Sequence, residues 1–238
     1  MKKPAISASI CDISKTKTGH LRINRGTEFD FLQSLIEAVF NLMTFGRQPI
    51  EVHQLQENHA MKEKINVFDY SKTILESLRK GVLLTTKVGD KTNTMTISWG
   101  ALGIEWAKPM MTVYVREHRF THEQLEANPE FTISIPMGEF DRKILGIAGT
   151  KSGRDVDKIK ELGVTLESPE VTSVPGIKEL PLTLECRVVY KQKQDPQSIK
   201  PEYNEFFYPQ DIDSTHHDRN KDYHTAYYGE IVDAYIIK

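Results

Sequence analysis

The chain has 238 residues, of which 39% are hydrophobic and 27% are charged, and its formal net charge is −2. This composition predicts a globular fold with a sizeable core, and the near-zero charge excludes the broad basic surface expected of a nucleic-acid-binding protein. Because no apolar run approaches the ~18 residues of a membrane span and the amino terminus has no signal-peptide core, we expect a cytoplasmic protein without membrane contact.

The first 60 residues differ in character from the rest of the chain. Within them, Phe29–Met43 repeats apolar residues at helical spacing, which predicts one amphipathic helix. This helix packs on the main domain, pairs with a second chain or stays poorly ordered. We therefore predict an extension of unknown role over residues 1–60 and one domain over residues 61–238.

The domain begins with a predicted helix that Asp69 or Ser71 caps, that runs through Leu75 and Leu78, and that Gly81 closes. Two strands follow around a Gly-Asp turn, and Cys186 is expected as a buried residue of a later strand. Strands in this number do not alternate with helices as βαβ units, so we predict a mainly β fold, an antiparallel barrel or sheet with peripheral helices. Further strands are expected over residues 110–116, 131–136, 182–191 and 227–237, and short helices over 121–127, 141–148 and 155–162. Residues 194–222 read as a long polar loop.

The first candidate site is the stretch KTNTMTISWG, residues 91–100. Strand alternation places Thr94, Thr96 and Ser98 on one face, where their hydroxyls and Asn93 can hydrogen-bond a polar ring or a phosphate. The alternative is a half-exposed strand with threonines facing solvent. The pair Trp99-Gly100 favours a ligand, since glycine beside an aromatic residue lets a flat molecule approach the backbone.

A second candidate site follows a predicted strand, where Arg116 and Arg119 come close together in sequence. Planar guanidinium groups suit a phosphate, although a solvated strand end is an equal alternative. Thr121 and Gln124 have the spacing of a capping box, so the Thr121 hydroxyl has a competing structural role at a helix start.

A third candidate is GTKSGRDVDKIKELG, residues 149–163. Lys151, Ser152, Gly153 and Arg154 precede a predicted helix and can form an anion-binding nest. The spacing does not match a phosphate-binding P-loop, and Ser152 as a simple helix cap is the alternative. Four side chains, Asp213, His216, His217 and His224, fit no compact metal template, and no Ser-His-Asp set is recognisable, so neither a metal nor a catalytic side chain is assigned.

Five stretches occur in an order that resembles the flavin reductase-like family: KGVLLTT, NTMTISWG, VYVREHRFTHEQL, GTKSGRDVDKIKELG and HTAYYGEIVDAYII. The resemblance covers the chain from about Met61 to its end. It implies an FMN-binding split β-barrel that forms a homodimer, with the flavin near the subunit interface. It also implies cofactor-binding roles for three groups: the ring and ribityl chain would contact Asn93, Thr94, Met95, Thr96, Ser98 and Trp99; the phosphate would contact Arg116, Arg119 and Thr121; and Lys151, Ser152 and Gly153 would complete the pocket.

The function implied by this resemblance is that of an FMN-dependent oxidoreductase. Hydride would pass from NAD(P)H to flavin N5 and electrons would pass on to an acceptor, which requires no protein acid or nucleophile. The alternatives are a flavoredoxin-like electron-transfer flavoprotein fed by a redox partner protein, and a flavin- or phosphate-binding module without redox turnover. A pocket for another phosphorylated ring, such as pyridoxal phosphate, is a weaker alternative, because a fold alone does not fix function.

Overall fold

A computed structural model describes residues 14–15, 21–22, 60–216 and 218–238 of the chain. The chain divides into two units, residues 1–57 and 58–238, and each is described by itself. In the first unit, β1 (Ser14–Lys15) pairs antiparallel with β2 (Leu21–Arg22). The predicted helix over Phe29–Met43 lies outside the described residues, so the role of the extension stays a prediction.

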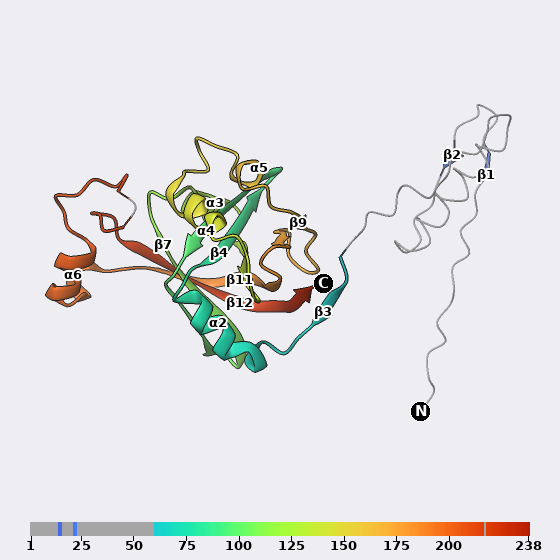
Figure 1. The fold of residues 1–238 in the computed structure, drawn as a ribbon, viewed down its shortest axis with the longest axis horizontal. Coiled ribbons are helices and arrows are strands. Elements are labelled where there is room, and N and C mark those ends of the chain that lie inside the picture. Colours follow the sequence, from blue (N-terminus) through green and yellow to red (C-terminus); the bar gives the residue numbers. More distant parts are fainter. Residues whose placement is uncertain (1–13, 16–20, 23–59, 217) are drawn as a thin grey trace. The chain divides into compact units, whose positions relative to one another are not determined.

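The second unit is built on one antiparallel sheet of eight strands (Figure 1). Neighbouring strands follow the order β5-β4-β8-β11-β12-β7-β6, and β3 pairs with β12. The prediction of a mainly β fold with an antiparallel sheet and peripheral helices is confirmed. The strands are β3 (Lys62–Lys64), β4 (Val82–Val88), β5 (Lys91–Ile97), β6 (Gly100–Glu105), β7 (Lys108–Arg116), β8 (Glu130–Ile135), β11 (Leu182–Lys193) and β12 (His224–Ile237).

The core lies on the inner face of this sheet. Phe131, Ile133 and Leu184 are fully buried, and Cys186 is buried beside them as predicted. The hairpin of β4 and β5 turns at Gly89, whose φ of +56° is the left-handed conformation that glycine adopts without strain. A separate two-stranded sheet joins β9 (Leu166–Glu167) to β10 (Gly176–Ile177).

Short helices surround the sheet. The helix α2 (Ser71–Leu78) runs through Leu75 and Leu78 as predicted, and the chain leaves it at Gly81 with φ of +106°. Its N-cap is Tyr70, without a side-chain hydrogen bond, so the predicted cap by Asp69 or Ser71 is wrong. The other α-helices are α3 (Phe120–Ala127), α4 (Lys143–Thr150), α5 (Lys158–Leu162) and α6 (Pro201–Phe207), and the 3₁₀ helices are η2 (Val67–Tyr70) and η3 (Pro196–Ser198). None of the helices in the described residues is long and apolar enough to cross a membrane.

Two helix starts differ from the prediction. Thr121 does not cap α3, because the helix already begins at Phe120 and Thr121 Oγ1 accepts a hydrogen bond from Asn93 instead. Ser152 does not cap α5 either. That helix begins at Lys158, and Asp157 caps it by accepting from the backbone of Lys160.

The segment between β11 and β12 was predicted as a loop without regular structure, and this is wrong in part. It contains η3 and α6, which Pro201 begins at a position where its missing N–H costs no helical hydrogen bond. In Figure 1 this segment projects from the sheet beyond the end where β11 stops and β12 starts. We call residues 194–216 and 218–223 the projecting segment.

Candidate functional site

Two adjoining cavities lie against β5, one of about 480 Å³ and one of about 280 Å³, which we call cavity A and cavity B. They share Met95 and Arg119 as lining residues. Cavity A is bounded by β5, the start of α3 and the chain around residues 150–158, whereas cavity B is bounded by β5, β7 and the projecting segment. Because they share two side chains, the cavities can hold the two ends of one elongated ligand.

All the residues predicted to bind a cofactor line one of these cavities except Thr94. The Thr94 hydroxyl donates to the Leu84 carbonyl at 3.3 Å and accepts from Thr85 Oγ1 at 3.1 Å. The Thr96 hydroxyl donates to Leu145 O at 2.6 Å. The structure thus brings Thr96 to cavity B but not Thr94, and both hydroxyls donate to main-chain carbonyls. Cavity A contains Asn93, Met95, Arg119, Thr121, Lys151, Ser152 and Gly153, and cavity B contains Met95, Thr96, Ser98, Trp99, Arg116 and Arg119.

Asn93 is the buried polar centre of cavity A, with 2% of its surface exposed. Its Nδ2 donates to Thr121 Oγ1 at 3.0 Å, while its Oδ1 has no hydrogen-bond partner in the described part of the chain. A Cβ atom on Gly153 would lie 2.1 Å from this oxygen, so only glycine lets the neighbouring backbone approach so closely. A buried acceptor without a donor is costly, which indicates that a ligand donor belongs at Asn93.

Two cations give cavity A its charge, Lys158, which is buried, and Arg119, which is partly buried. Lys158 is 4% exposed and donates to Thr94 O at 2.9 Å and to Ala148 O at 2.8 Å. Burial, and then the charge of Arg119, lowers the pKa of Lys158 to about 8. Arg119 donates to Gly149 O at 3.3 Å, and burial lowers its pKa also. Burial disfavours both charges, so an anion in cavity A would be stabilised by them.

Arg116 does not face a phosphate in cavity A. Its guanidinium donates to main-chain carbonyls of the projecting segment, and its side chain lies over the Tyr208 ring at 5.1 Å from the centroid. These contacts argue against the predicted phosphate contact of Arg116. The carbonyl acceptors belong to Phe207 at 3.2 Å, Asp218 at 3.0 Å, Asn220 at 3.4 Å and Asp222.

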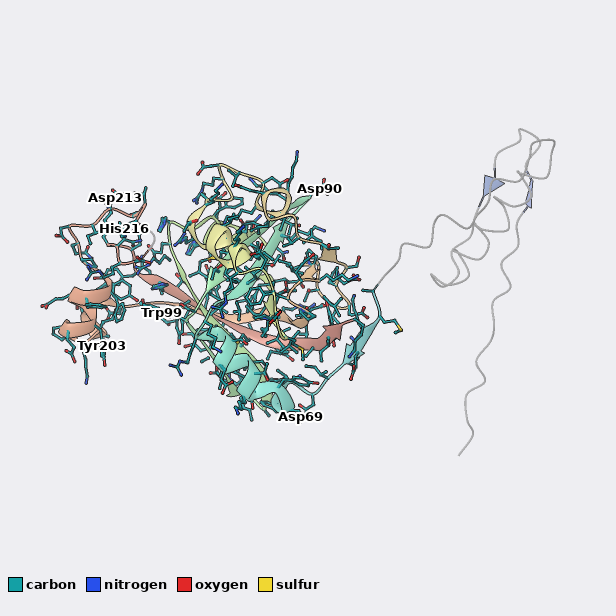
Figure 2. The ribbon with its side chains drawn as sticks, in the orientation of Figure 1. Asp69, Asp90, Trp99, Tyr203, Asp213 and His216 are labelled. Carbon is teal, nitrogen blue, oxygen red and sulfur yellow. The ribbon has the colours of Figure 1, made fainter. Side chains whose placement is uncertain are left out.

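Cavity B is lined by aromatic rings. Trp99 lies 5.1 Å from Phe207 in an edge-to-face arrangement and 5.1 Å from the His224 ring. Burial first, and then the charge of Arg116, lowers the pKa of His224 to about 3, so the imidazole is neutral at physiological pH. Figure 2 shows Trp99 on the side of the barrel that faces the projecting segment, which carries Tyr203, Asp213 and His216. The arrangement suits a flat and largely apolar ring.

Several lining residues were missed at the level of the sequence. Arg154 was noticed only as a basic neighbour of Gly153, yet it donates to His118 O at 2.8 Å and pairs with Glu123 at 3.0 Å. Its position in a basic stretch was a usable signal. The contributions of the projecting segment had no such signal, because they come from residues distant in sequence. The further lining residues are His118, Phe120, Thr150, Asp155, Val156, Lys158 and Thr215 in cavity A and Ile97, Tyr114, Phe207, Asp218, Arg219 and His224 in cavity B.

No group of three or more metal-ligating side chains lies together in the described residues. His118 instead pairs with a carboxylate, since its Nδ1 lies 2.5 Å from Asp222 Oδ2. Burial first, and then the charges of Arg119 and Arg116, lower the pKa of His118, although Asp222 raises it. Through its contact with Asp222, the His118 imidazole connects the turn after β7 to the projecting segment.

Fold and site together define a β-barrel protein with a positively charged cavity next to an aromatic one. The model of the flavin reductase like domain matches residues 77–238, and the chain belongs to this family. A solved FMN-binding domain of a flavin reductases-like enzyme from Shewanella baltica has the same fold, with a TM-score of 0.53 and 17% identity over 75% of this chain and 78% of that one. The fold is thus the split β-barrel that the resemblance implied.

Two curated relatives are uncharacterized proteins of archaea. One, from Archaeoglobus fulgidus, is 31% identical over 127 residues, or 53% of this chain and 67% of the relative. Another, from Pyrococcus abyssi, is 35% identical over 106 residues, or 44% of this chain and 59% of the relative. The second match thus spans less than two thirds of the relative's own length.

Proposed function

We propose that this chain binds FMN across cavities A and B and acts as an FMN-dependent oxidoreductase. The observation that carries the proposal is the pair of adjoining cavities, with the unsatisfied Asn93 oxygen in one and the aromatic lining in the other. FMN combines a phosphate, a chain of hydroxyl groups and a flat ring. These three parts match the cations of cavity A, the buried acceptor and the aromatic lining.

Different residues of the site would bind the phosphate, the ribityl chain and the ring of FMN. Arg119, Lys158 and Ser152 would hold the phosphate in cavity A, and Asn93 would accept from a ribityl hydroxyl. Met95 and Trp99, with the backbone of β5, would hold the ring. When bound, FMN supplies hydride and electron transfer, which the side chains of the protein lack.

The protein's own part is to orient the ligand and to control charge near the ring. His224 stays neutral because it is buried, so it adds no positive charge to cavity B at physiological pH. Phe207 and Trp99 line cavity B from two elements, with their rings 5.1 Å apart in an edge-to-face arrangement. Since a flavin needs no dedicated side-chain acid or nucleophile for hydride exchange, the absence of an assigned catalytic side chain is consistent with the proposal.

In the proposed reaction, NAD(P)H gives hydride to the flavin and the reduced flavin passes electrons to an acceptor. The second candidate is an electron-transfer flavoprotein that takes electrons from a redox partner protein instead. The projecting segment favours this second candidate, because Phe207 and Arg219 line cavity B and restrict the room for a nicotinamide ring.

The test is an anaerobic spectral titration of the purified protein with FMN, then with NADPH or NADH, and finally with dithionite. Bleaching by a nucleotide supports the oxidoreductase and identifies its donor, whereas bleaching by dithionite alone supports the electron carrier. A protein that gains no bound flavin spectrum would refute both. As a check on the site, Asn93→Ala should weaken FMN binding by about tenfold, since one ligand hydrogen bond to a buried acceptor is lost.

We also propose that the chain forms a homodimer through the apolar surface around β6. Ile104 is 71% exposed on this edge strand, and Trp106 is 61% exposed in the turn that follows. Trp106 and Ala107 have φ of +50° and +59°, a conformation rarely adopted by residues other than glycine. Light scattering should give the mass of a dimer for the full chain, and Ile104→Asp should shift it toward the monomer. A monomeric wild type at micromolar concentration would refute the proposal.

A further inference from the structure

Arg116 ends β7 at the point where the projecting segment returns to the sheet. It lies opposite His224, the first residue of β12, in the antiparallel register. The side chain is 6% exposed. Its backbone is therefore fixed by the sheet, while its guanidinium reaches into a segment that has no strand partner.

Four main-chain carbonyls of that segment point at this one guanidinium. Nη2 donates to Phe207 O and Asp218 O, and Nη1 donates to Asn220 O and Asp222 O. Carbonyls outside helices and strands need donors from elsewhere. Arginine can serve several at once, because its five N–H groups are held in a planar fork.

Other contacts also hold the projecting segment in place. His118 pairs with Asp222 at 2.5 Å, and Tyr223 OH donates to Asn204 at 2.8 Å. Asn220 is fully buried and its Nδ2 donates to His216 O at 2.7 Å. Tyr223 and Arg116 both join the two ends of the segment, and Arg116 does so with four acceptors, at residue 207 and at residues 218–222.

This segment supplies the outer wall of cavity B, through Phe207, Asp218 and Arg219. We propose that Arg116 is a positioning residue that organises this wall, so that it governs binding of the flavin ring and not of the phosphate. The inference rests on the proposed function for the identity of the ring. The phosphate then depends on Arg119 and on its neighbours in cavity A.

Binding of two ligands separates the two roles. FMN and riboflavin share the ring, and only FMN carries the phosphate. In the full chain, Arg116→Ala should raise the dissociation constants of both ligands by the same factor, about tenfold. Arg119→Ala should weaken FMN much more than riboflavin. A loss confined to FMN in the Arg116 variant would overturn the proposal.

Limited trypsin digestion of the flavin-free chain gives a second measurement that does not need flavin. Arg219 and Lys221 are exposed cleavage sites within the wall. Arg116→Ala should speed cleavage at both sites several-fold, measured by mass spectrometry, while Lys87 within β4 stays protected. Unchanged cleavage at Arg219 and Lys221 would overturn the proposal. If Arg116→Ala loses its fold altogether, Lys87 is cleaved as well, and the Arg116→Lys variant then tests the role of Arg116.

Arg116→Lys keeps the positive charge but has only one donor nitrogen for the four carbonyls. We expect it to resemble Arg116→Ala in digestion and in ligand binding, and wild-type behaviour would overturn the need for a guanidinium. Arg187→Ala is the matched control, since Arg187 lies on β11 and pairs with Glu130. If no variant and no wild-type protein binds flavin, the proposed function fails, while the digestion still tests the role of Arg116.

Discussion

Replacing Gly153 with alanine tests the arrangement at the centre of cavity A. The added Cβ would lie 2.1 Å from Asn93 Oδ1, and 2.9 Å from both Asn93 Cγ and Phe120 Cδ1. Contacts below about 3 Å do not persist, so one of these groups must move. Asn93 is buried and bonded to Thr121, and Phe120 lies beneath the Lys91 ammonium at 4.6 Å. Neither side chain is free to yield.

The cost follows from this overlap. Forcing one extra methyl group into a packed site costs about 1–3 kcal/mol, and loss of the Asn93–Thr121 hydrogen bond adds about 1 kcal/mol. We expect Gly153→Ala to lower the free energy of unfolding by about 2–4 kcal/mol, or the melting temperature by roughly 4–16 °C for a domain of this size. Displacement of Asn93 should also weaken FMN binding by about tenfold.

The assay pairs thermal melts followed by circular dichroism with FMN titrations. Gly146→Ala is the matched control, because a Cβ there meets nothing within 4 Å and the residue lies inside α4. Alanine favours a helix over glycine by about 0.5–1 kcal/mol, so this variant should be slightly more stable than wild type. If Gly153→Ala melts and binds FMN like wild type, the close contact of Gly153 and Asn93 is refuted.

Three other predictions follow from single contacts. Glu185→Gln should lower the free energy of unfolding, measured by urea denaturation, by about 3 kcal/mol. The reason is that the buried carboxylate accepts from Tyr235 OH at 2.9 Å and from backbone N–H groups. A loss below about 0.5 kcal/mol would contradict this. Lys158 has a pKa of about 8 in the folded chain and an ordinary value of 10.5, so between these pH values the unfolded chain binds more protons than the folded chain. Lys158 therefore makes the free energy of unfolding rise with pH across this window. Relative to Lys158→Met, wild type should gain stability from pH 8 to 10, and parallel curves of stability against pH would refute the burial of the charge. Gly229→Ala should destabilise by about 2–3 kcal/mol in the same urea assay, since its Cβ would lie 2.5 Å from Phe131 Cζ, and a wild-type midpoint would contradict this packing.

The fold was largely predictable because its strands carry local signals. The hairpin of β4 and β5 has a Gly-Asp turn between apolar runs, and β7 and β12 have strong strand patterns. By contrast β6, with the sequence GALGIE, has two glycines and no clear alternation, so no strand was predicted there. It is a strand because β7 supplies hydrogen bonds along its whole length.

The site was predictable as a set of segments but not as a set of contacts. Alternation along β5 placed Thr94 and Thr96 correctly on one face, and Thr96 lines cavity B, yet the hydroxyls of both donate to main-chain carbonyls, of Leu84 and of Leu145. Alternation distinguishes two faces of a strand, but it does not say which face meets helices and which meets a ligand. The position of α4 decides this, and its contact with β5 joins residues about fifty positions apart in sequence.

The two arginines after β7 show why spacing alone was insufficient. Arg116 still belongs to the strand, whereas Arg119 is the first residue of the turn into α3, where the backbone N–H of Arg119 donates to Arg116 O. The chain reverses direction between them, so proximity in sequence does not make the side chains parallel. The Arg116 guanidinium donates to carbonyls that lie 91–106 residues further along the chain, whereas the Arg119 guanidinium donates to the carbonyl of Gly149. Burial is the main cause that lowers the pKa of Arg116, and the positive charge of Arg119 lowers it further. In the proposed site the phosphate therefore depends on Arg119 in cavity A, whereas Arg116 acts on the ring through the wall of cavity B.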